Sequence, residues 1–543
     1  MLPKGSRQPR CLSGPWHAAC LAMLIAFLAV TRVAVAAPAG ELHVGVPRVP
    51  ASLDPAAATV SSELMAMRLL YEGLVAFGER GDIEPALATA WAVSREGLVW
   101  TFRLRPDVQL HDGMPLGLDD VVAALAARVS ADEPPDGAPT WVRPFRGAGR
   151  LVREVRRGEG ASVQVVLGQP YAPLLALLAH PALAVAVSRG AGHWTGSGPY
   201  RAVELTPDRL ALEAAPNWRG EPPQSARLTL HAVADDAAAL AGFGPRGPLH
   251  AALVAAPPAW AALGLQVVSA PTWRVGLVAL RTDRGLTSRK AVRQAVALAL
   301  DPGLVRPALG RWAVPYAGWL PPGAWAAREA GPLPFDLARA RRLLAQVAPL
   351  DPTLTLLASD QASGPEAAGI AEAVRLSLGA AGLRTRVRLE LPDAAGTAAR
   401  QGTAELTLHE ETLEVNDPDL FLRPLLATEG TTLGSATNVA FLRSPLVDGM
   451  LVRASQLGFR PERFRLYQRL QGLLAEELPY VPLYVRLQWM VARPEVRGAR
   501  LDPGGLHRLE RMGLDATPVS GGPPGAGGPP AGNGGAGPPP QQP

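Results

Sequence analysis

Cysteine, lysine and aromatic residues are scarce in this chain of 543 residues. Its two cysteines, Cys11 and Cys20, both lie near the N-terminus, in a stretch that has the pattern of an export signal. The rest of the chain therefore has no disulfide, no thiol nucleophile and no thiolate metal site. Lysine occurs only at Lys4 and Lys290, while Ala, Gly, Pro and Arg abound, which indicates a GC-rich genome more than a function.

The charge pattern gives no sign of a nucleic-acid partner. The formal net charge is +5, but four of the basic residues lie within residues 1–36 and no acidic residue balances them there. The remainder is close to neutral, and no basic patch is interleaved with aromatic side chains. We therefore expect no nucleic acid among the partners of this protein.

Residues 1–36 have the pattern of a secretory signal peptide. A basic start precedes an apolar run from Ala18 to Val30, and Ala34 to Ala36 form an A-x-A cleavage site. The run is shorter than the roughly 20 apolar residues that span a bilayer. We expect cleavage and a periplasmic mature protein, with an uncleaved membrane anchor as the alternative.

The sequence lacks the motifs of several enzyme classes. His409-Glu410-Glu411 begins like the zinc motif H-E-x-x-H, but Leu413 stands where the second histidine belongs. The glycines between Gly242 and Gly247 are interrupted by Pro245 and follow no clear strand, which argues against a nucleotide site. No G-x-S-x-G elbow occurs, and no two histidines have ligand spacing. We expect no catalytic residues, no metal and no cofactor.

The stretch from Leu53 to Val122 carries the most specific pattern. It contains LDP, YEGL, EPALATAW and LVWTFRLRPDVQLHDG in that order. Its spacing predicts a helix running to Tyr71, a half-buried strand over Val99–Leu104 and a second helix around Val121. Further on, the segments Thr353–Leu357, Glu366–Leu378 and Thr385–Leu391 predict a βαβ unit with a parallel sheet.

These pieces closely resemble the extracellular solute-binding proteins of ABC importers, family 5, the branch that binds oligopeptides, dipeptides and nickel chelates. The resemblance covers roughly residues 41–500. It implies an α/β fold of the periplasmic-binding-protein type (class II, cluster C), with two lobes around a ligand cleft and an extra small α/β domain in the first lobe. The implied divisions are a signal peptide at 1–36, a main first-lobe domain at 37–57, 190–270 and 489–512, an accessory domain at 58–189, a second lobe at 271–488, and a disordered Gly/Pro-rich tail at 513–543.

The resemblance also implies where the ligand lies. The segment EETLEVNDPDLFL (Glu410–Leu422) is similar to the family pattern W-x-x-D-Y-x-D-P-D-x-F-L. Glu414 takes the position whose carboxylate holds the α-amino group of a peptide, and Glu411 replaces the tryptophan. Both are also consistent with surface carboxylates. Arg423 could pair with them or with a ligand carboxylate. Trp273 and Tyr484 are further ligand candidates by position, although a core role fits each of them better.

The implied function is capture of a small solute or peptide by lobe closure and delivery to the transmembrane subunits of an ABC permease, by a monomer. Two alternatives remain open. One is a non-transport sensor or chaperone of the same family. The other is a secreted hydrolase that uses Glu411, Glu414 and Asp417. Two helix starts are predicted as well, with Ser288 and Asp336 as capping residues.

Overall fold

The computed structural model describes residues 40–515 except for short segments at 79–80, 131, 133–141, 143, 148–149, 191, 256–259, 261–262, 348–352 and 361–366. The predicted signal peptide, residues 1–36, and the chain from residue 516 on lie outside the described residues. Gly513 and Leu514, placed in the tail by the sequence, pair with Val496 and Arg497 instead. Their neighbour Met512 is buried in a core, which anchors this end of the described chain.

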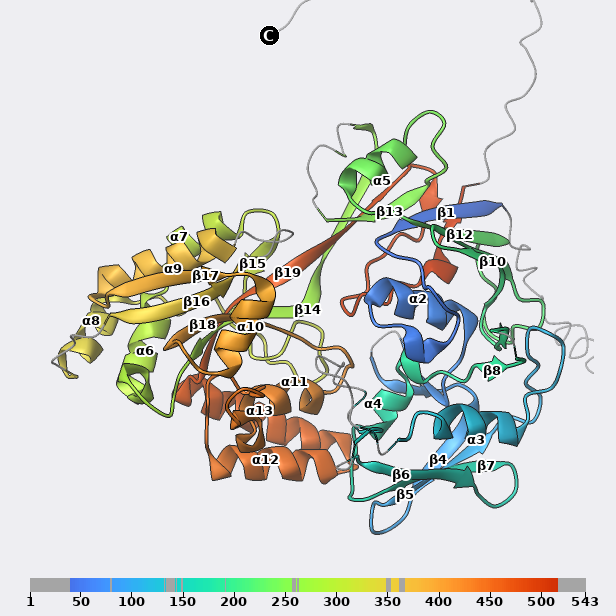
Figure 1. Ribbon diagram of the computed structural model, residues 1–543, viewed down its shortest axis with the longest axis horizontal. Coiled ribbons are helices and arrows are strands. Elements are labelled where there is room, and N and C mark those ends of the chain that lie inside the picture. Colours follow the sequence, from blue (N-terminus) through green and yellow to red (C-terminus); the bar gives the residue numbers. More distant parts are fainter. Residues whose placement is uncertain are drawn as a thin grey trace, which may run out of the picture.

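One mixed sheet of 11 strands runs through the whole molecule (Figure 1). It includes long antiparallel strands and short parallel ones. In spatial order its strands are β10 (Tyr200–Thr206), β11 (Arg209–Ala214), β12 (Arg227–Ala232), β1 (Glu41–Val46), β13 (Ala251–Val254), β19 (Tyr480–Ala492), β14 (Gln266–Leu280), β18 (Leu406–Thr412), β16 (Leu354–Ser359) and β17 (Thr385–Glu390), and β15 (Ala313–Pro315) pairs with β19.

The two longest strands, β14 and β19, connect the two ends of this sheet (Figure 1). They pair with each other in antiparallel register, and the register shifts between Pro271 and Val275. On one side of that shift β19 pairs with β13, and on the other side β14 pairs with β18. The shift therefore marks the place where the sheet passes from one lobe to the other.

The first lobe is defined here as the set of elements that share one hydrophobic core with helix α2 (Ser61–Leu70). This core joins the strand residues Leu42, Val44 and Val46 to a separate four-stranded sheet. That sheet has the order β4 (Ala88–Val93), β5 (Val99–Leu104), β7 (Ser162–Leu167) and β6 (Val152–Arg157), with helices α3 (Leu118–Ala126) and α4 (Leu174–Leu178) packed nearby. The predicted strand Val99–Leu104 is thus confirmed, with its alternate residues Trp100, Phe102 and Leu104 buried.

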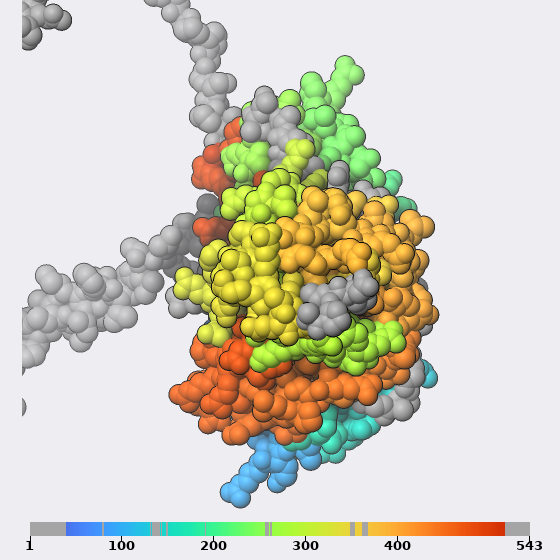
Figure 2. Space-filling model, turned by 90° about the vertical axis from the view of Figure 1, so that its left-hand side faces the viewer, coloured from blue at the N-terminus to red at the C-terminus, as the bar shows by residue number. Residues whose placement is uncertain are grey.

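The second lobe is defined here as the strands β14, β18, β16 and β17 together with the helices that pack on their two faces. One core contains α6 (Lys290–Ala299), α7 (Pro302–Leu309), α8 (Leu337–Ala345) and α9 (Ala367–Ala381). The other contains α10 (Pro392–Arg400), α11 (Pro418–Leu426), α12 (Pro445–Gln456) and α13 (Arg460–Glu477). Strands β16 and β17 are parallel with α9 between them in sequence, so the predicted βαβ unit is confirmed. Figure 2 shows the face of the molecule that lies on the left in Figure 1, with the yellow to amber part of the second lobe above and its orange to red part below.

Of the two predicted helix caps, one is confirmed and one is wrong. Asp336 accepts a hydrogen bond from the backbone of Arg339 at 2.8 Å and begins α8. Ser288 does not cap α6, because it lies in a 3-10 turn and donates its hydroxyl back to Gly285. Arg289 takes the cap position without a side-chain bond.

The remaining elements are short. They are helix α5 (Asp236–Gly242), strand pairs β2 (Val75–Phe77) with β3 (Ile83–Pro85), β8 (Val187–Ser188) with β9 (Trp194–Thr195) and β20 (Val496–Arg497) with β21 (Gly513–Leu514), and 3-10 turns at Pro55–Ala57, Pro181–Leu183, Leu286–Ser288, Thr428–Thr431 and Leu509–Arg511. Among the described residues, no helix is long and apolar enough to cross a membrane.

Candidate functional site

The segment that the sequence singled out, Glu410–Leu422, runs from the end of β18 into the first turn of α11. Asp417 is the N-cap of α11, and its carboxylate accepts a hydrogen bond from the backbone of Asp419 at 3.0 Å. Pro418 occupies the first helical turn, where its missing N–H costs nothing. The Asp-Pro-Asp motif is therefore first of all a helix start, which fixes the direction of the chain that leaves β18.

A buried ion pair holds this helix start in place. Both guanidinium nitrogens of Arg463, on α13, donate to Asp417 at 2.7 and 2.8 Å, and neither side chain is more than 7% exposed. Arg463 also donates to the hydroxyl of Tyr467 and lies over the ring of Trp325. The charge of Asp417 is thus balanced by Arg463 inside the second lobe. The geometry gives no support for a catalytic role of this carboxylate.

The second aspartate of the motif connects the two lobes. Asp419 is buried and accepts two bonds from Arg423 at 3.1 Å, together with the hydroxyl of Tyr171 from the first lobe at 3.2 Å. Burial raises the pKa of Asp419, while the guanidinium of Arg423 acts in the opposite direction. Arg423 also donates to Ser455 on α12 at 3.2 Å. Asp419 lies one turn away on the same helix, which favours this pair. Pairing of Arg423 with Glu411, Glu414 or a ligand carboxylate stays a prediction.

Apolar and backbone contacts join the lobes at the same place. Val415 and Leu420, from the second-lobe segment, are buried in the core of the first lobe. The backbone N–H of Ala172, in the first lobe, donates to the carbonyl of Ser455 at 2.6 Å. Asn416 is only 4% exposed, and its amide lies against Gly81 of the first lobe, where no Cβ would fit. The motif therefore acts as a docking segment between the lobes.

Glu414 and Glu411, the two carboxylates carried over from the family pattern, lie on either side of the end of β18. Glu414 is half-buried in the short connection between β18 and α11. Glu411, within β18, lies 3.2 Å from Nε2 of His409 on the same face of the strand. The structure places both on the edge of the lobe junction, and their role in binding stays a prediction.

Trp273 and Tyr484 occupy different environments. Tyr484 is buried on β19 and belongs to a hydrophobic core, which is the core role that the sequence also allowed for it. Trp273 is half-buried on β14 at the junction, where its backbone N–H donates to Pro503 of the first lobe at 2.8 Å and its carbonyl accepts from Leu413 at 2.9 Å. Its indole nitrogen is buried and finds no hydrogen-bond partner among the described residues. The role of Trp273 in binding stays a prediction.

A polar cluster that sequence reasoning missed surrounds Glu410. Tyr484 reaches across Gly276, where any side chain would overlap its ring, and donates to the Glu410 carboxylate at 2.9 Å. Arg486 donates to the same oxygen at 2.5 Å, and Arg274 lies 3.9 Å from the other. Burial raises the pKa of Tyr484 well above its ordinary value, with a further contribution from Glu410. The sequence contained one signal for this cluster. Successive side chains of a strand point to opposite faces, so Glu410 and Glu411 were bound to lie in different surroundings.

Part of β18 has a free backbone edge. Strand β14 pairs with β18 along its whole length, from Leu406 to Thr412. On the opposite edge β16 pairs only with Leu406 and Thr407. In the described part of the chain nothing pairs with that edge from Leu408 to Thr412. The unpaired stretch carries Glu410 and Glu411 and leads directly to Glu414.

Three histidines with no special spacing in the sequence meet on the face of the first-lobe sheet opposite Leu42 and Val44. Nδ1 of His43 lies 2.9 Å from Nε2 of His231, and the backbone of His43 donates to Nδ1 of His250 at 3.1 Å. Burial lowers the pKa of His231 and of His250, and the neighbouring His43 lowers both further. No group of three or more His, Cys, Asp or Glu residues suited to a metal ion occurs among the described residues.

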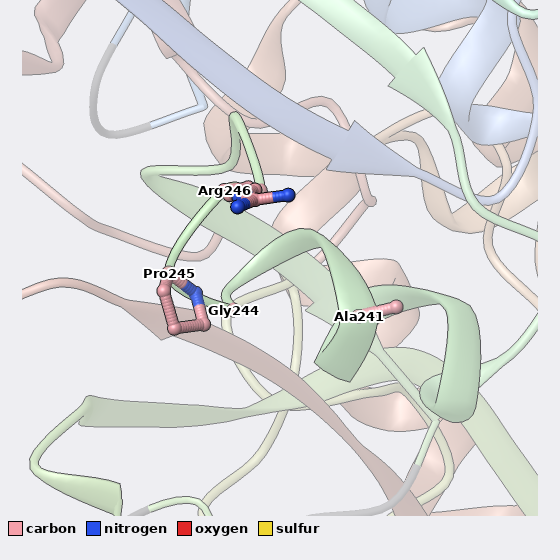
Figure 3. A pocket seen from close by; sticks show the side chains of 5 residues that line it. Ala241, Gly244, Pro245 and Arg246 are labelled. Carbon is pink, nitrogen blue, oxygen red and sulfur yellow. The ribbon is translucent and has the colours of Figure 1, made fainter.

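A depression of about 440 Å³ lies beside the glycine-rich loop that was considered as a nucleotide motif (Figure 3). It is lined by Ala241 and Gly244–Gly247. This loop follows the short helix α5 and leads to β13, whereas a nucleotide loop lies between a strand and the start of a helix. The motif is therefore a turn at a helix end.

The chain matches the family model of bacterial extracellular solute-binding proteins, family 5, over residues 82–432. It belongs to this family. Members are the periplasmic binding proteins of ABC importers, so the predicted class, a solute-binding receptor with this α/β fold, is confirmed. The matched region includes the first-lobe segments from Glu84 onward and the Asp-Pro-Asp segment, whereas LDP and YEGL lie before it.

Curated relatives cover nearly the whole chain. Di/tripeptide-binding protein 2 of Pseudomonas aeruginosa is 26% identical over 527 residues, which is 91% of this chain and 98% of the relative. The glutathione-binding protein GsiB of Salmonella typhi is 24% identical, with 80% of this chain and 86% of the relative covered. Heme-binding protein A of Haemophilus influenzae is 25% identical, with 82% and 87% covered. These relatives bind chemically different solutes, so membership alone does not name the ligand.

Solved structures share the fold. HbpA2 from Haemophilus parasuis aligns with a TM-score of 0.76 at 19% identity, over 88% of this chain and all of that chain. The murein tripeptide-binding protein MppA, in an unliganded open form, aligns with a TM-score of 0.74 at 22% identity, over 88% and 98%. At these identities the likeness establishes the two-lobed architecture.

Proposed function

We propose that this protein is the receptor for short peptides of an ABC importer and that it binds them along the free edge of β18. The observation that carries the proposal is the unpaired stretch Leu408–Thr412 at the lobe junction. An extended peptide can add to such an edge through backbone hydrogen bonds, which give affinity without reading side chains. Peptide binding of this kind suits a di- or tripeptide receptor, the class of the relative from Pseudomonas aeruginosa.

Charged groups near this edge match the ends of a peptide. Glu414 follows the free stretch and is proposed to receive the α-amino group. Charge-assisted hydrogen bonds are strong where water is excluded, so closing the lobes over the ligand would strengthen this contact.

Delivery requires a change between open and closed lobes. The long strands β14 and β19 form the connection, and their register shift at Pro271–Val275 is the place where bending costs few hydrogen bonds. A ligand that contacts both lobes favours the closed form, which the permease then recognises. We propose that the protein acts in this way as a monomer, exported by the signal at residues 1–36, and that it performs no chemistry on its ligand.

The hydrolase alternative has less support. Asp417 is paired with Arg463, Glu411 lies beside His409, and no group of side chains suited to hold a metal ion occurs in the described structure. A sensor or chaperone role would use the same binding site. A genetic test separates it from transport, because deletion of the cognate permease would abolish peptide uptake only in the transport case.

Isothermal calorimetry with defined di- and tripeptides tests the proposal. We expect saturable 1:1 binding of free peptides and much weaker binding of the same peptides after N-acetylation, since acetylation removes the charge that Glu414 would meet. Equal affinity for both sets would refute the amino-group contact. Absence of binding by any peptide would refute the peptide ligand itself.

A further inference from the structure

Charge is distributed unevenly along this chain. The segment 284–347 contains ten basic and three acidic residues, an excess of seven positive charges, although the chain beyond residue 36 is close to neutral as a whole. This segment forms α6, α7 and α8, which pack on one face of the second-lobe sheet. The excess of positive charge therefore belongs to one part of the second lobe and is not spread over the molecule.

Helix α8 presents part of this charge at the end of the second lobe that is farthest from the first lobe (Figure 1). Ala340 and Leu344 are buried and attach the helix to the core. The exposed surface of the same helix carries Arg339, Arg341 and Arg342. One turn of helix thus holds three guanidinium groups at the tip of the lobe.

These three arginines have no counter-charge within the described part of the chain. None of them forms an ion pair with a described carboxylate. Arg341 donates to the backbone carbonyl of Ala380 at 2.7 Å, and this neutral partner leaves its charge uncompensated. The carboxylate of Asp336 accepts the backbone N–H of Arg339 at 2.8 Å, because it caps the helix.

The carboxylates on the neighbouring helices are already paired. Glu372 on α9 bonds to Arg375 at 2.6 Å. Glu477 at the end of α13 bonds to Lys290 at 2.8 Å. The arginines of α8 are thus left with a net positive charge that an external anion can meet.

An exposed aromatic ring adjoins the arginines. Phe335 immediately precedes α8 and is 43% exposed, whereas Leu333, two residues earlier, is buried in the core. The backbone N–H of Phe335 donates to the carbonyl of Leu333 at 2.9 Å, which holds the two residues in a tight turn. Arginines beside an exposed aromatic ring are typical of surfaces that lie on a membrane, where the cations meet headgroups and the ring enters the apolar boundary.

We propose that the exposed surface of α8, together with Phe335, binds the anionic headgroup surface of a membrane. The guanidinium groups of Arg339, Arg341 and Arg342 would pair with lipid phosphates, for which their planar fork is suited. A lipid surface is favoured over an acidic protein, because these groups lie on a protruding tip and a fluid surface needs no complementary shape. Three cations and one ring give weak, reversible adhesion.

This inference goes beyond the proposed function and does not depend on the ligand. A receptor of an ABC importer delivers its solute to a permease in the membrane. Reversible adhesion through the tip of the second lobe would keep the receptor close to that membrane and limit its orientations. The encounter with the permease would then occur by diffusion along the surface.

Cosedimentation of the full mature protein with vesicles tests the proposal. One set of vesicles is phosphatidylcholine alone, and the other also contains phosphatidylglycerol. We expect binding to the anionic set at low ionic strength and release at about 1 M salt, where charges are screened beyond about 3 Å. Each arginine near an anionic surface contributes roughly fivefold to partitioning, so Arg339→Gln/Arg342→Gln should lose at least tenfold. Phe335→Ala should lose severalfold.

A matched variant controls for net charge. Arg103→Gln/Arg246→Gln removes two exposed arginines from the first lobe and should bind vesicles as the parent does. Melting temperatures and calorimetric peptide binding should be the same for all these variants, so failure here leaves the proposed function untouched.

Three results would overturn the inference. The first is equal binding of the parent to both sets of vesicles. The second is an equal loss of binding in the two double variants, which would show that net charge alone matters. The third is binding only to phosphatidylcholine vesicles that contain the cognate permease, which would identify an acidic protein surface as the partner.

Discussion

Tyr171 of the first lobe donates its hydroxyl to Asp419 of the second lobe at 3.2 Å. The neighbouring residue Ala172 donates its backbone N–H to Ser455 across the same junction at 2.6 Å. The two bonds form a latch beside the docking segment of α11. Because the Asp419 carboxylate is buried, the phenol bond to it should contribute measurably to lobe contact.

We predict that Tyr171→Phe loosens this latch without unfolding either lobe. Loss of a hydrogen bond to a charged group costs about 1.5–3 kcal/mol, which corresponds to about tenfold or more in the opening equilibrium. Hydrogen exchange at the Ala172 amide should accelerate accordingly. Tyr316→Phe is a matched control, since Tyr316 bonds to Leu320 within the second lobe. Unchanged exchange at Ala172 in Tyr171→Phe would contradict the latch.

We predict that Asp417→Asn destabilises the second lobe strongly. The substitution leaves the guanidinium of Arg463 buried without its counter-charge, at a cost of about 3–5 kcal/mol. Thermal unfolding should show a clear drop in melting temperature. Glu204→Gln, which removes the exposed partner of Arg209, should have little effect. Equal melting temperatures for the two variants would show that the buried pair is not structural.

Acid should destabilise the protein between about pH 6.5 and pH 4. Burial, with a smaller contribution from Arg68, lowers the pKa of His507 to about 4, and burial lowers the pKa of His180 to about 3. Both imidazoles are therefore neutral in the folded state at pH values where the unfolded chain, with a pKa of about 6.5, is protonated. The unfolded state binds more protons in this window, so stability falls as pH falls.

The contribution of one histidine can be isolated. Nδ1 of His507 accepts a hydrogen bond from the backbone of Asp502 at 3.0 Å, which protonation would break. His507→Asn keeps an acceptor at this position and should flatten the pH dependence of the unfolding free energy by about 1.4 kcal/mol per pH unit in the window. His193→Gln, at an exposed site, is the control. An unchanged slope in His507→Asn would refute this assignment.

Glu414→Gln should weaken binding of a short peptide at least tenfold and leave folding intact. Removing one partner of a closed charge pair costs about 2–5 kcal/mol. Glu411→Gln should have a smaller effect, because Glu411 takes the position of the family's tryptophan and not that of the amino-binding carboxylate. Calorimetry on both variants checks the order. If Glu414→Gln binds as tightly as the parent, the amino-group anchor lies elsewhere and a neutral or anionic ligand becomes the better hypothesis.

The sequence predicted the fold better than the site, for physical reasons. Alternation such as Val99–Leu104 and caps such as Asp336 are local signals, so these elements were recognised. Ser288 was misassigned because its hydroxyl bonds to Gly285, a choice that the local pattern does not reveal. The pairing of Arg423 with Asp419, four residues earlier on the same helix, was not among the partners that the sequence suggested, which were Glu411, Glu414 or a ligand carboxylate.

Contacts between residues far apart in the chain could not be predicted from the sequence pattern. The cluster of Glu410 with Tyr484 and Arg486 joins residues more than 70 positions apart, and Arg274 adds a third strand. The contact of Tyr171 with Asp419 spans two lobes. Such pairs depend on strand register and lobe packing, which no single segment encodes.

The central claim is that this chain binds a short peptide and releases it unchanged. Native mass spectrometry of the purified mature protein, mixed with a defined di- and tripeptide pool, tests it most directly. We predict one bound peptide per protein molecule, with the composition of the pool unchanged after hours of incubation. Loss of peptides with appearance of free amino acids would show a hydrolase, and a spectrum with no bound peptide at any pool concentration would contradict the account.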